Sequence, residues 1–460
     1  MRPYFVNIIN RVEKINSAVT CKSAVLTGIL LCMMAVSIGV PLIKESDSFS
    51  TVVVADSFLS LAAIFVLINR KSIEDFHIKK TYVIPLLLIG ISFIFNGVYY
   101  SVMGYLAVGL IFCILIPLIN LVFYSNSHVM ICTAVSKAVI ISFIAFVLIS
   151  IMSGAALGKT QYTAILSNPN TLGNYMLIVV AANIYLMCDR DYRKNKCFPV
   201  LYITLALAVV IAIYTNSRTS MIAIFLQLVV VSLMYLARKI KCRDISGCLR
   251  LVKRGFIFIL TVAVMFFAMF FILTTVKVQL IKALPDIQIT KKYDDVELKD
   301  LLNRMGARYT KGLNNSDKSS LDDDQFTSGR KEIWKDYIDN IGFLGHKTES
   351  RNIVEKLRIY HGTNAHNVYL QMAYSAGLIA GMAMIIIMIF AAKDLLQKMY
   401  RFIRKGIMDD GLVLTICCAL GFVTVSLTSG GYMIYTYLPS TFFYLSLFTL
   451  SVNERNKEYS

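Results

Sequence analysis

The chain has 460 residues, of which 57% are hydrophobic, and a formal net charge of +18. Soluble domains carry about 45–50% apolar residues and rarely contain long uncharged runs, whereas residues 103–124, MGYLAVGLIFCILIPLINLVFY, contain no charge at all. Because roughly 18 apolar residues can cross a bilayer, the composition excludes an ordinary soluble domain and predicts an all-α, polytopic transmembrane helix bundle. The positive charge does not call for nucleic acid, because membrane proteins concentrate Lys and Arg in their cytoplasmic loops.

About twelve membrane spans are predicted along the chain. The first apolar run, residues 24–43, is long enough to span and lacks the small-residue site of a cleavable signal peptide, so a retained helix is expected. The predicted spans are 24–43, 51–69, 82–100, 103–123, 138–157, 172–188, 199–216, 219–237, 255–276, 366–391, 411–429 and 432–451.

The distribution of Lys and Arg between the short loops predicts the orientation. One set of loops is strongly basic, and the other set holds only Lys44, Lys159 and Arg218. The positive-inside rule therefore predicts a multi-pass protein of the cytoplasmic membrane with both termini in the cytoplasm. The basic segments are RKSIEDFHIKK (70–80), DRDYRKNK (189–196), RKIKCRDISGCLRLVKR (238–254) and KDLLQKMYRFIRKG (393–406).

One extracytoplasmic segment is long and hydrophilic. Long loops translocate whatever their charge, so residues 277–365 fit the predicted orientation, and none of the ten cysteines lies in them. The expected organisation is a transmembrane bundle of nine spans (1–276), an extracytoplasmic loop containing short helices (277–365), and three further spans with a cytoplasmic tail (366–460).

His366 precedes the tenth predicted span, in the segment TNAHNVYLQMAYSAGLIAG (363–381). Thr363 or Asn364 is expected to cap one continuous helix that contains His366. At about 100° per residue, three small residues of this helix fall within roughly 60° of the direction of His366. A row of small residues usually faces a neighbouring helix, because it lets the two backbones approach. The histidine is therefore expected to point into the bundle at its outer mouth, unless it is an interfacial side chain bonded to a carbonyl. The small residues are Ala373, Gly377 and Gly381.

Arg218 is the only charge in the tight turn YTNSRTSM (214–221) between spans seven and eight. An arginine is costly near hydrocarbon, so its guanidinium must meet water, a carbonyl or an anion. The two hypotheses are that Arg218 extends to the membrane surface and that it forms an anion site.

An amphipathic helix is predicted within FTSGRKEIWKDYIDNIGFLG (326–345), starting at Ser328 or Gly329 and ending at Gly342. Its apolar side favours a helix that lies on the membrane or on the spans. Arg330 falls in the first turn, where a cation opposes the helix dipole, so the residue is either solvated or paired with a bound anion. The apolar side consists of Ile333, Trp334, Tyr337, Ile338 and Ile341.

At these residues the chain resembles the O-antigen ligase and O-antigen/capsule polymerase superfamily of integral-membrane glycosyltransferases. The motifs are S-R-[TS] between two spans, G-R-x-x-x-W in a long outside loop, and H-N-x-[YL]-L-Q followed by G-L-[IL]-[AG]-G. They occur here as Ser217-Arg218-Thr219, as Gly329-Arg330 with Trp334, and as His366 to Gln371 followed by Gly377 to Gly381. The Asn168-Pro169-Asn170 turn before span six also looks like many polymerases. The resemblance covers residues 160–400, and the first five spans match in hydropathy alone.

The resemblance implies transfer of a saccharide from a polyprenyl diphosphate carrier to a sugar hydroxyl at the outer face of the cytoplasmic membrane, with no metal, nucleotide or other cofactor. Arginine binds phosphate oxygens through a planar fork, so Arg218 and Arg330 are expected to hold the diphosphate. A neutral imidazole is a suitable base near pH 7, so His366 is the expected general base or a positioning donor. Asn367, Asn170 and Trp334 are the expected supporting residues.

The resemblance leaves the acceptor open. A ligase would use lipid A–core, a polymerase would use the next lipid-linked repeat, and some relatives modify proteins; the turn at residues 168–170 favours a polymerase. The alternative from another class is a transporter or flippase of lipid-linked sugars, because twelve spans are common there. Such proteins often have two halves joined in the cytoplasm, whereas this hydrophilic insertion follows span nine on the outside. Release of glycan from a lipid-linked substrate distinguishes transferase from transporter.

Overall fold

The computed structural model describes residues 22–43, 48–67, 79–119, 127–152, 161–166, 168–189, 198–276, 303, 330–346, 365–429, 431 and 437–451. These residues are mostly helical, and no β-sheet forms among them. Within them, eight helices are long and apolar enough to cross a membrane, and three shorter apolar helices accompany them. The prediction of an all-α, multi-pass membrane protein is confirmed, and the count of twelve spans stays a prediction.

Two helices extend beyond the apolar runs that predicted them. Helix α8 (His128–Met152) begins at His128 rather than near residue 138, and α13 (Ile245–Phe271, followed by the π-helical turn η2, Ile272–Val276) begins at Ile245 rather than near 255. The start of α13 is set by Asp244, whose side chain accepts a hydrogen bond from the backbone N–H of Gly247 at 2.8 Å. A capping residue sets where a helix begins by accepting hydrogen bonds from its first backbone N–H groups, whereas hydropathy identifies only the apolar part of that helix.

The chain forms two compact units, each with its own core. The first unit comprises Met1–Ala138 and Trp334–Ser460, and the second comprises Val139–Ile333. The boundaries fall inside two helices, α8 and α16 (Arg330–Asp339).

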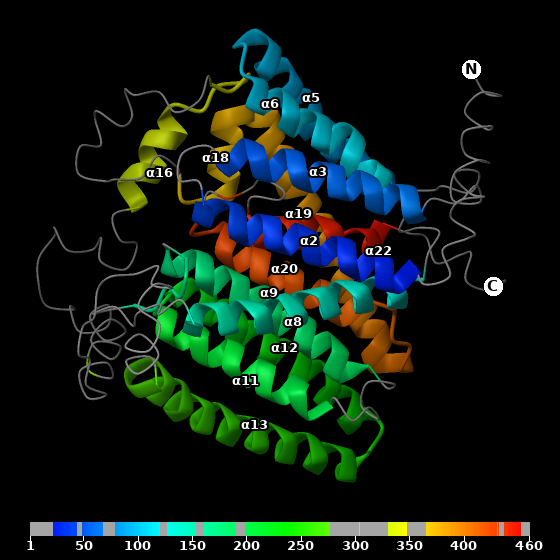
Figure 1. Ribbon diagram of the computed structural model, residues 1–460. Helices are drawn as coiled ribbons and strands as arrows, with labels where there is room; N and C mark the ends of the chain where they lie inside the picture. Colours follow the sequence, from blue (N-terminus) through cyan, green and yellow to red (C-terminus); the bar gives the residue numbers. More distant parts are fainter. Residues whose placement is uncertain are drawn as a thin grey trace, which may run out of the picture. The chain divides into compact units, whose positions relative to one another are not determined.

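In the first unit, two pairs of neighbouring helices pack along their lengths. Helices α2 (Lys22–Ile43) and α3 (Ser48–Leu67) lie side by side (Figure 1). The Ser37 hydroxyl donates to the buried Asp56 carboxylate at 2.7 Å. Helix α5 (Lys80–Tyr99) packs on α6 (Met103–Leu110), which continues through the π-helical η1 (Ile111–Leu115). Glycines make this second contact close: a Cβ on Gly109 would lie 2.8 Å from the carbonyl oxygen of Gly90.

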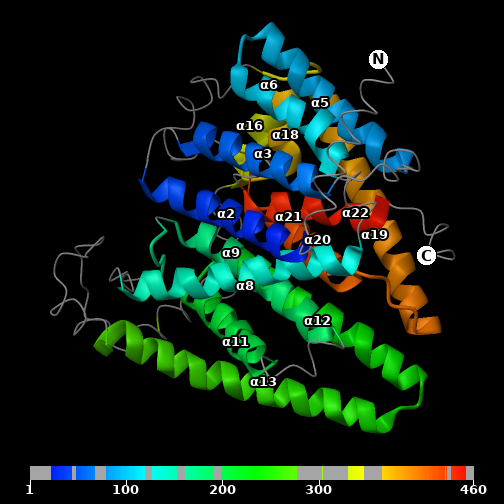
Figure 2. The same cartoon turned by 45° about the vertical axis from the view of Figure 1, so that its right-hand side comes forward.

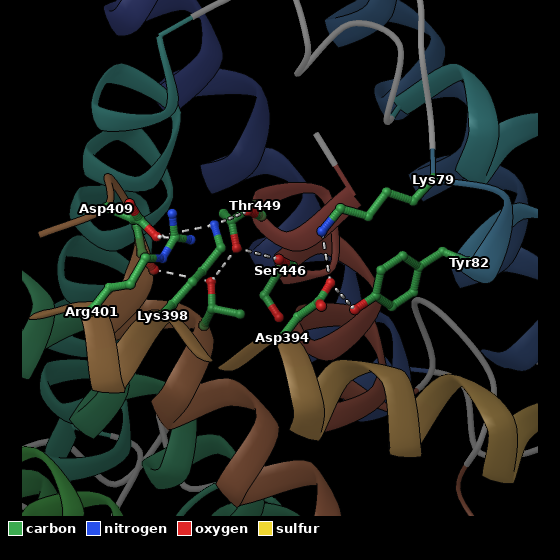
Figure 3. Close-up of polar contacts among 10 residues, drawn as sticks. Lys79, Tyr82, Asp394, Lys398, Arg401, Asp409, Ser446 and Thr449 are labelled. Atoms are coloured by element: carbon green, nitrogen blue, oxygen red, sulfur yellow. Dashed lines mark hydrogen bonds and ion pairs between the residues drawn. The ribbon is translucent and has the colours of Figure 1, made fainter. Parts of the chain in front are cut away.

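Helix α19 (Leu378–Lys405) connects α5 to the C-terminal helices α20 (Leu412–Ser426), α21 (Leu438–Ser446) and α22 (Phe448–Ser451). The Asp394 carboxylate accepts from Lys79 Nζ at 2.8 Å and from the Tyr82 hydroxyl at 3.0 Å. One turn later, the buried Lys398 donates to the carbonyl oxygen of Thr449 at 2.8 Å (Figure 3). These contacts fix the C-terminal half of α19, which lies at the predicted cytoplasmic side.

The second unit is built around α9 (Pro169–Cys188), with α11 (Phe198–Thr215) and α12 (Arg218–Lys241) packed against it. Helix α9 is 83% buried over its most apolar stretch, which makes it the central helix of this unit. Helix α13 contacts α11 and α12 and is only 11% buried, so most of its apolar surface is left for lipid (Figure 2).

Candidate functional site

The helix predicted over 366–391 is broken into two helices, so the prediction of one continuous helix is wrong. Helix α18 (Val368–Ala376) ends at Gly377, whose φ of 96° is favourable only for glycine, and α19 begins at Leu378. A Cβ on Gly381 would lie 2.7 Å from the Cβ of Ala373. The small residues therefore allow α18 and α19 to approach each other across the break, instead of forming one row on a single helix.

His366 lies just outside α18 and not on its surface. The helix is capped by Asn367, whose Oδ1 accepts from the backbone N–H groups of Tyr369 at 3.0 Å and Leu370 at 3.1 Å, so the expected cap at residues 363–364 is wrong. His366 is half-buried and adopts a left-handed backbone conformation, with a φ of 46°. Left-handed non-glycine residues are uncommon and collect at functional sites.

Ala365, the residue before His366, forms hydrogen bonds with side chains through both its backbone N–H and its carbonyl oxygen. Ala365 is fully buried, its N–H donates to Gln371 Oε1 at 2.8 Å, and its carbonyl accepts from Trp334 Nε1 at 2.9 Å. Gln371 Nε2 in turn donates to the Ser375 hydroxyl at 3.0 Å. This network determines where the backbone enters the His366 turn.

Trp334 belongs to α16, so the predicted amphipathic helix exists and packs on the spans. Its buried residues are Ile333 and Tyr337, and the Tyr337 ring meets the Tyr374 ring of α18 at 4.8 Å between centroids. Ile338 is 56% exposed, so the apolar side that contacts the protein is narrower than predicted.

The segment that follows α16 is bound to α5, α6 and the break after α18. The Tyr100 hydroxyl donates to the carbonyl oxygen of Gly345 at 3.1 Å, and the Tyr105 hydroxyl donates to that of His346 at 3.2 Å. The backbone N–H of Leu378, the first residue of α19, donates to the carbonyl oxygen of Gly342 at 3.2 Å. The helix that carries Trp334 is thus fixed at its C-terminal end as well.

Arg330 is the first residue of α16, one helical turn before Trp334 and on the same face of that helix. It is half-buried, and burial lowers the pKa of its guanidinium from the ordinary value. Within the described part of the chain no carboxylate forms an ion pair with it. A partly buried cation in the first turn of a helix favours an anionic ligand.

Arg218 starts α12 directly after a two-residue turn, as the sequence predicted. Asn216 turns the chain with a φ of 53°, and the backbone N–H of Ser217 donates to Thr215 Oγ1 at 3.2 Å. The hydroxyls of Ser217 and Ser220 lie 3.1 Å apart. Arg218 itself is half-buried at the N-terminal end of the helix, where free N–H groups favour an anion.

The start of α9 lies against this turn and brings the Asn168-Pro169-Asn170 motif near it. Ser220 Oγ donates to Asn174 Oδ1 at 3.3 Å, and a Cβ on Gly173 would lie 2.5 Å from Ser220 Oγ. Asn168 caps α9 by accepting from the backbone N–H of Asn170 at 2.8 Å, which leaves the Asn170 side chain exposed. Two helix N-terminal ends are therefore adjacent beside Arg218.

The predicted site residues fall into two groups. Trp334 and Asn367 flank His366 in the first unit, and Asn170 lies near Arg218 in the second. Convergence of both groups on one cavity stays a prediction. Four further residues hold the two groups in place, and the sequence motifs predicted no role for them: Gln371, Ser375, Asn174 and Gly173. Helical spacing could have identified Gln371, which is one turn after Asn367, but the contact with Trp334 depends on tertiary packing.

Comparison with known proteins identifies the part of the chain that carries these groups. Residues 203–386 match the family model described as O-antigen ligase, and no curated protein matches the chain. The matched range includes Arg218, Arg330, Trp334 and His366 but not Asn170. The resemblance to the O-antigen ligase and polymerase superfamily is confirmed, and it supports a glycosyltransferase-like role in polysaccharide biosynthesis for this multi-pass membrane protein.

Proposed function

Because residues 203–386 match the O-antigen ligase family model, we propose that this protein transfers a saccharide from a polyprenyl diphosphate carrier to a sugar hydroxyl at the outer face of the cytoplasmic membrane. The observation that carries the proposal is the hydrogen bond from Trp334 Nε1 to Ala365. It connects the helix that begins with Arg330 to the turn that contains His366, and so joins two of the three motifs.

The proposed reaction is a displacement at the anomeric carbon of the donor sugar. The acceptor oxygen forms the new glycosidic bond, its proton passes to His366, and the bond between the sugar and the diphosphate breaks. Negative charge then grows on the leaving diphosphate, where Arg218 and Arg330 stabilise it through bidentate hydrogen bonds. A general base of this kind typically contributes about 10²–10⁴-fold to the rate.

The surroundings of the three residues suit these roles. Arg218 and Arg330 each occupy the first position of a helix, so backbone N–H groups add to the attraction for phosphate. His366 is held between Ala365, fixed at both backbone groups, and the cap residue Asn367. A base positioned by its neighbours loses little entropy when it meets the acceptor hydroxyl.

The acceptor separates two versions of the proposal. A polymerase would elongate the lipid-linked repeat itself, whereas a ligase would need lipid A–core. The capping turn at Asn168 favours the polymerase only by its likeness to many polymerases.

The purified protein with defined lipid-linked repeats tests the proposal. A ladder of longer lipid-linked glycans made from the donor alone would support a polymerase, and a product formed only with lipid A–core would support a ligase. Absence of glycan release with either acceptor, in a preparation that still binds the donor, would contradict both versions. Activity in the presence of a strong chelator is expected, because the proposed chemistry uses no metal.

A further inference from the structure

A cavity of about 380 Å³ lies within the second unit, among residues 184–258. It is formed by the end of α9, the start of α11, the second half of α12 and the first half of α13. Its volume is within the range of about 300–1,000 Å³ that is usual for small-molecule sites. Its walls are mainly apolar, including Leu205, Leu228, Leu236 and Phe258, and Arg254 is the one charged residue among the described lining residues.

Gly255 of α13 is exposed and belongs to the lining of the cavity. A Cβ on Gly255 would meet no atom within 4 Å, so no side chain fills this part of the wall. Leu233 and Val252, which also line the cavity, are 56% and 65% exposed. The cavity therefore reaches the surface of the unit that faces lipid.

The segment that leads to the cavity and ends at its lining residue Arg254 is strongly basic, and we call it the basic mouth. Residues 238–254 contain seven Lys or Arg residues and a single acidic residue, Asp244. The Lys239 ammonium forms an ion pair with the Asp244 carboxylate at 2.6 Å, and this contact lowers the pKa of that carboxyl. Exposed Arg254, at the end of this segment, is close enough to the phenol of Tyr202 for an electrostatic interaction.

The cavity lies at the opposite end of α12 from Arg218. The lining residues of α12 begin at Leu228, about 15 Å along the helix axis from Arg218 at roughly 1.5 Å per residue. The basic segment between α12 and α13 is also the one that the positive-inside rule assigns to the cytoplasmic face. A molecule bound in this cavity would therefore lie at the cytoplasmic leaflet, at the opposite end of α12 from the proposed phosphate ligand Arg218.

We propose that this cavity binds an anionic membrane phospholipid, with an acyl chain between α11, α12 and α13 and its phosphate beside Arg254. An acyl chain matches the apolar walls, and the negative headgroup matches the basic mouth. Basic pockets between membrane helices at the cytoplasmic face are suited to such headgroups, and each nearby cation contributes about 1 kcal/mol. The site does not depend on the proposed glycosyl transfer.

Native mass spectrometry of the purified full chain in detergent tests this site with dioleoyl phosphatidylglycerol and, as a zwitterionic control, dioleoyl phosphatidylcholine. The wild type should retain one phosphatidylglycerol at concentrations that leave phosphatidylcholine unbound, and the bound lipid should raise the unfolding temperature. Arg254→Gln should weaken retention about fivefold. The matched variant Arg243→Gln removes an exposed charge of the same segment outside the cavity and should change retention by less than about twofold.

A second pair of variants tests the cavity itself. Gly255→Leu fills open space with a better helix former, so the protein should fold and lose retention of the lipid. Gly104→Leu, at another open glycine in α6, is the control and should retain it. Equal retention of the two phospholipids, or equal effects of Arg254→Gln and Arg243→Gln, would overturn the proposal in favour of non-specific surface attraction. Displacement of phosphatidylglycerol by an equimolar polyprenyl phosphate would also overturn it, because the occupant would then be the carrier lipid.

Discussion

The indole N–H of Trp334 donates a hydrogen bond to the carbonyl oxygen of Ala365 over 2.9 Å, across a separation of 31 residues. Ala365 directly precedes His366, and Trp334 follows Arg330 by one helical turn. A single side-chain contact therefore relates the candidate base to one of the two candidate phosphate ligands. Trp334 is accordingly a positioning residue, since it acts through the backbone beside His366.

Replacing Trp334 with Phe removes this donor and keeps most of the aromatic volume. A buried carbonyl left without a partner costs about 1–3 kcal/mol, so we expect turnover to fall roughly tenfold while the Kd of the lipid-linked donor changes little. Ile338→Ala, on the exposed side of the same helix, is the control and should keep wild-type turnover. Equal losses in turnover and donor affinity would instead indicate general disruption of α16.

The two arginines should act mainly on the donor. We expect Arg218→Ala and Arg330→Ala each to weaken donor binding and to abolish most activity, because each removes a phosphate ligand at a helix start. The lysine variants should recover only part of the activity, since lysine lacks the bidentate fork. Lys331→Ala, at an exposed neighbour of Arg330, should leave donor binding unchanged. Full activity in both lysine variants would mean that charge alone is sufficient.

Gly173→Ala tests the packing of α9 against the turn before Arg218. The added methyl group would lie 2.5 Å from Ser220 Oγ and 3.2 Å from Ser217 Cβ, so one helix must shift. We expect the unfolding temperature and the activity to fall, with a cost of about 1–3 kcal/mol for overpacking. Gly104→Ala has open space and should be neutral in both measurements. A neutral Gly173→Ala would show that the contact is not required.

Reporter fusions test the orientation. A reporter joined after Lys318, in the long hydrophilic segment, and one joined after Lys405, at the end of α19, should report opposite sides of the membrane. The reason is the concentration of Lys and Arg in alternate short loops. Two reporters on the same side would refute the predicted topology.

Short motifs identified the local structure of the site well. The turn before Arg218 and the helix that carries Trp334 follow from spacing and capping rules that act within a few residues. The break at Gly377 could not be predicted from these rules, because a glycine in an apolar run is compatible with either a continuous or a broken helix. The docking of residues 342–345 into that break decides between them, and such contacts between distant segments leave no periodic signal.

The same limitation applies to the surroundings of His366. Its helix cap was expected among residues 363–364, and Asn367 takes that role because the histidine itself adopts the left-handed turn. Histidine is one of the few side chains enriched in that conformation, but many histidines occur elsewhere, so sequence alone does not predict it.

The central claim, that His366 is the general base, is tested most directly by the turnover of His366→Asn with purified lipid-linked saccharide. Asparagine tolerates the left-handed conformation at this position, so the loss of the imidazole is separated from a loss of fold. The account predicts that turnover falls by about 10²–10⁴-fold, while donor binding stays at the wild-type level because both arginines remain. Turnover at the wild-type rate would contradict the claim and would make His366 an interfacial side chain without a chemical role.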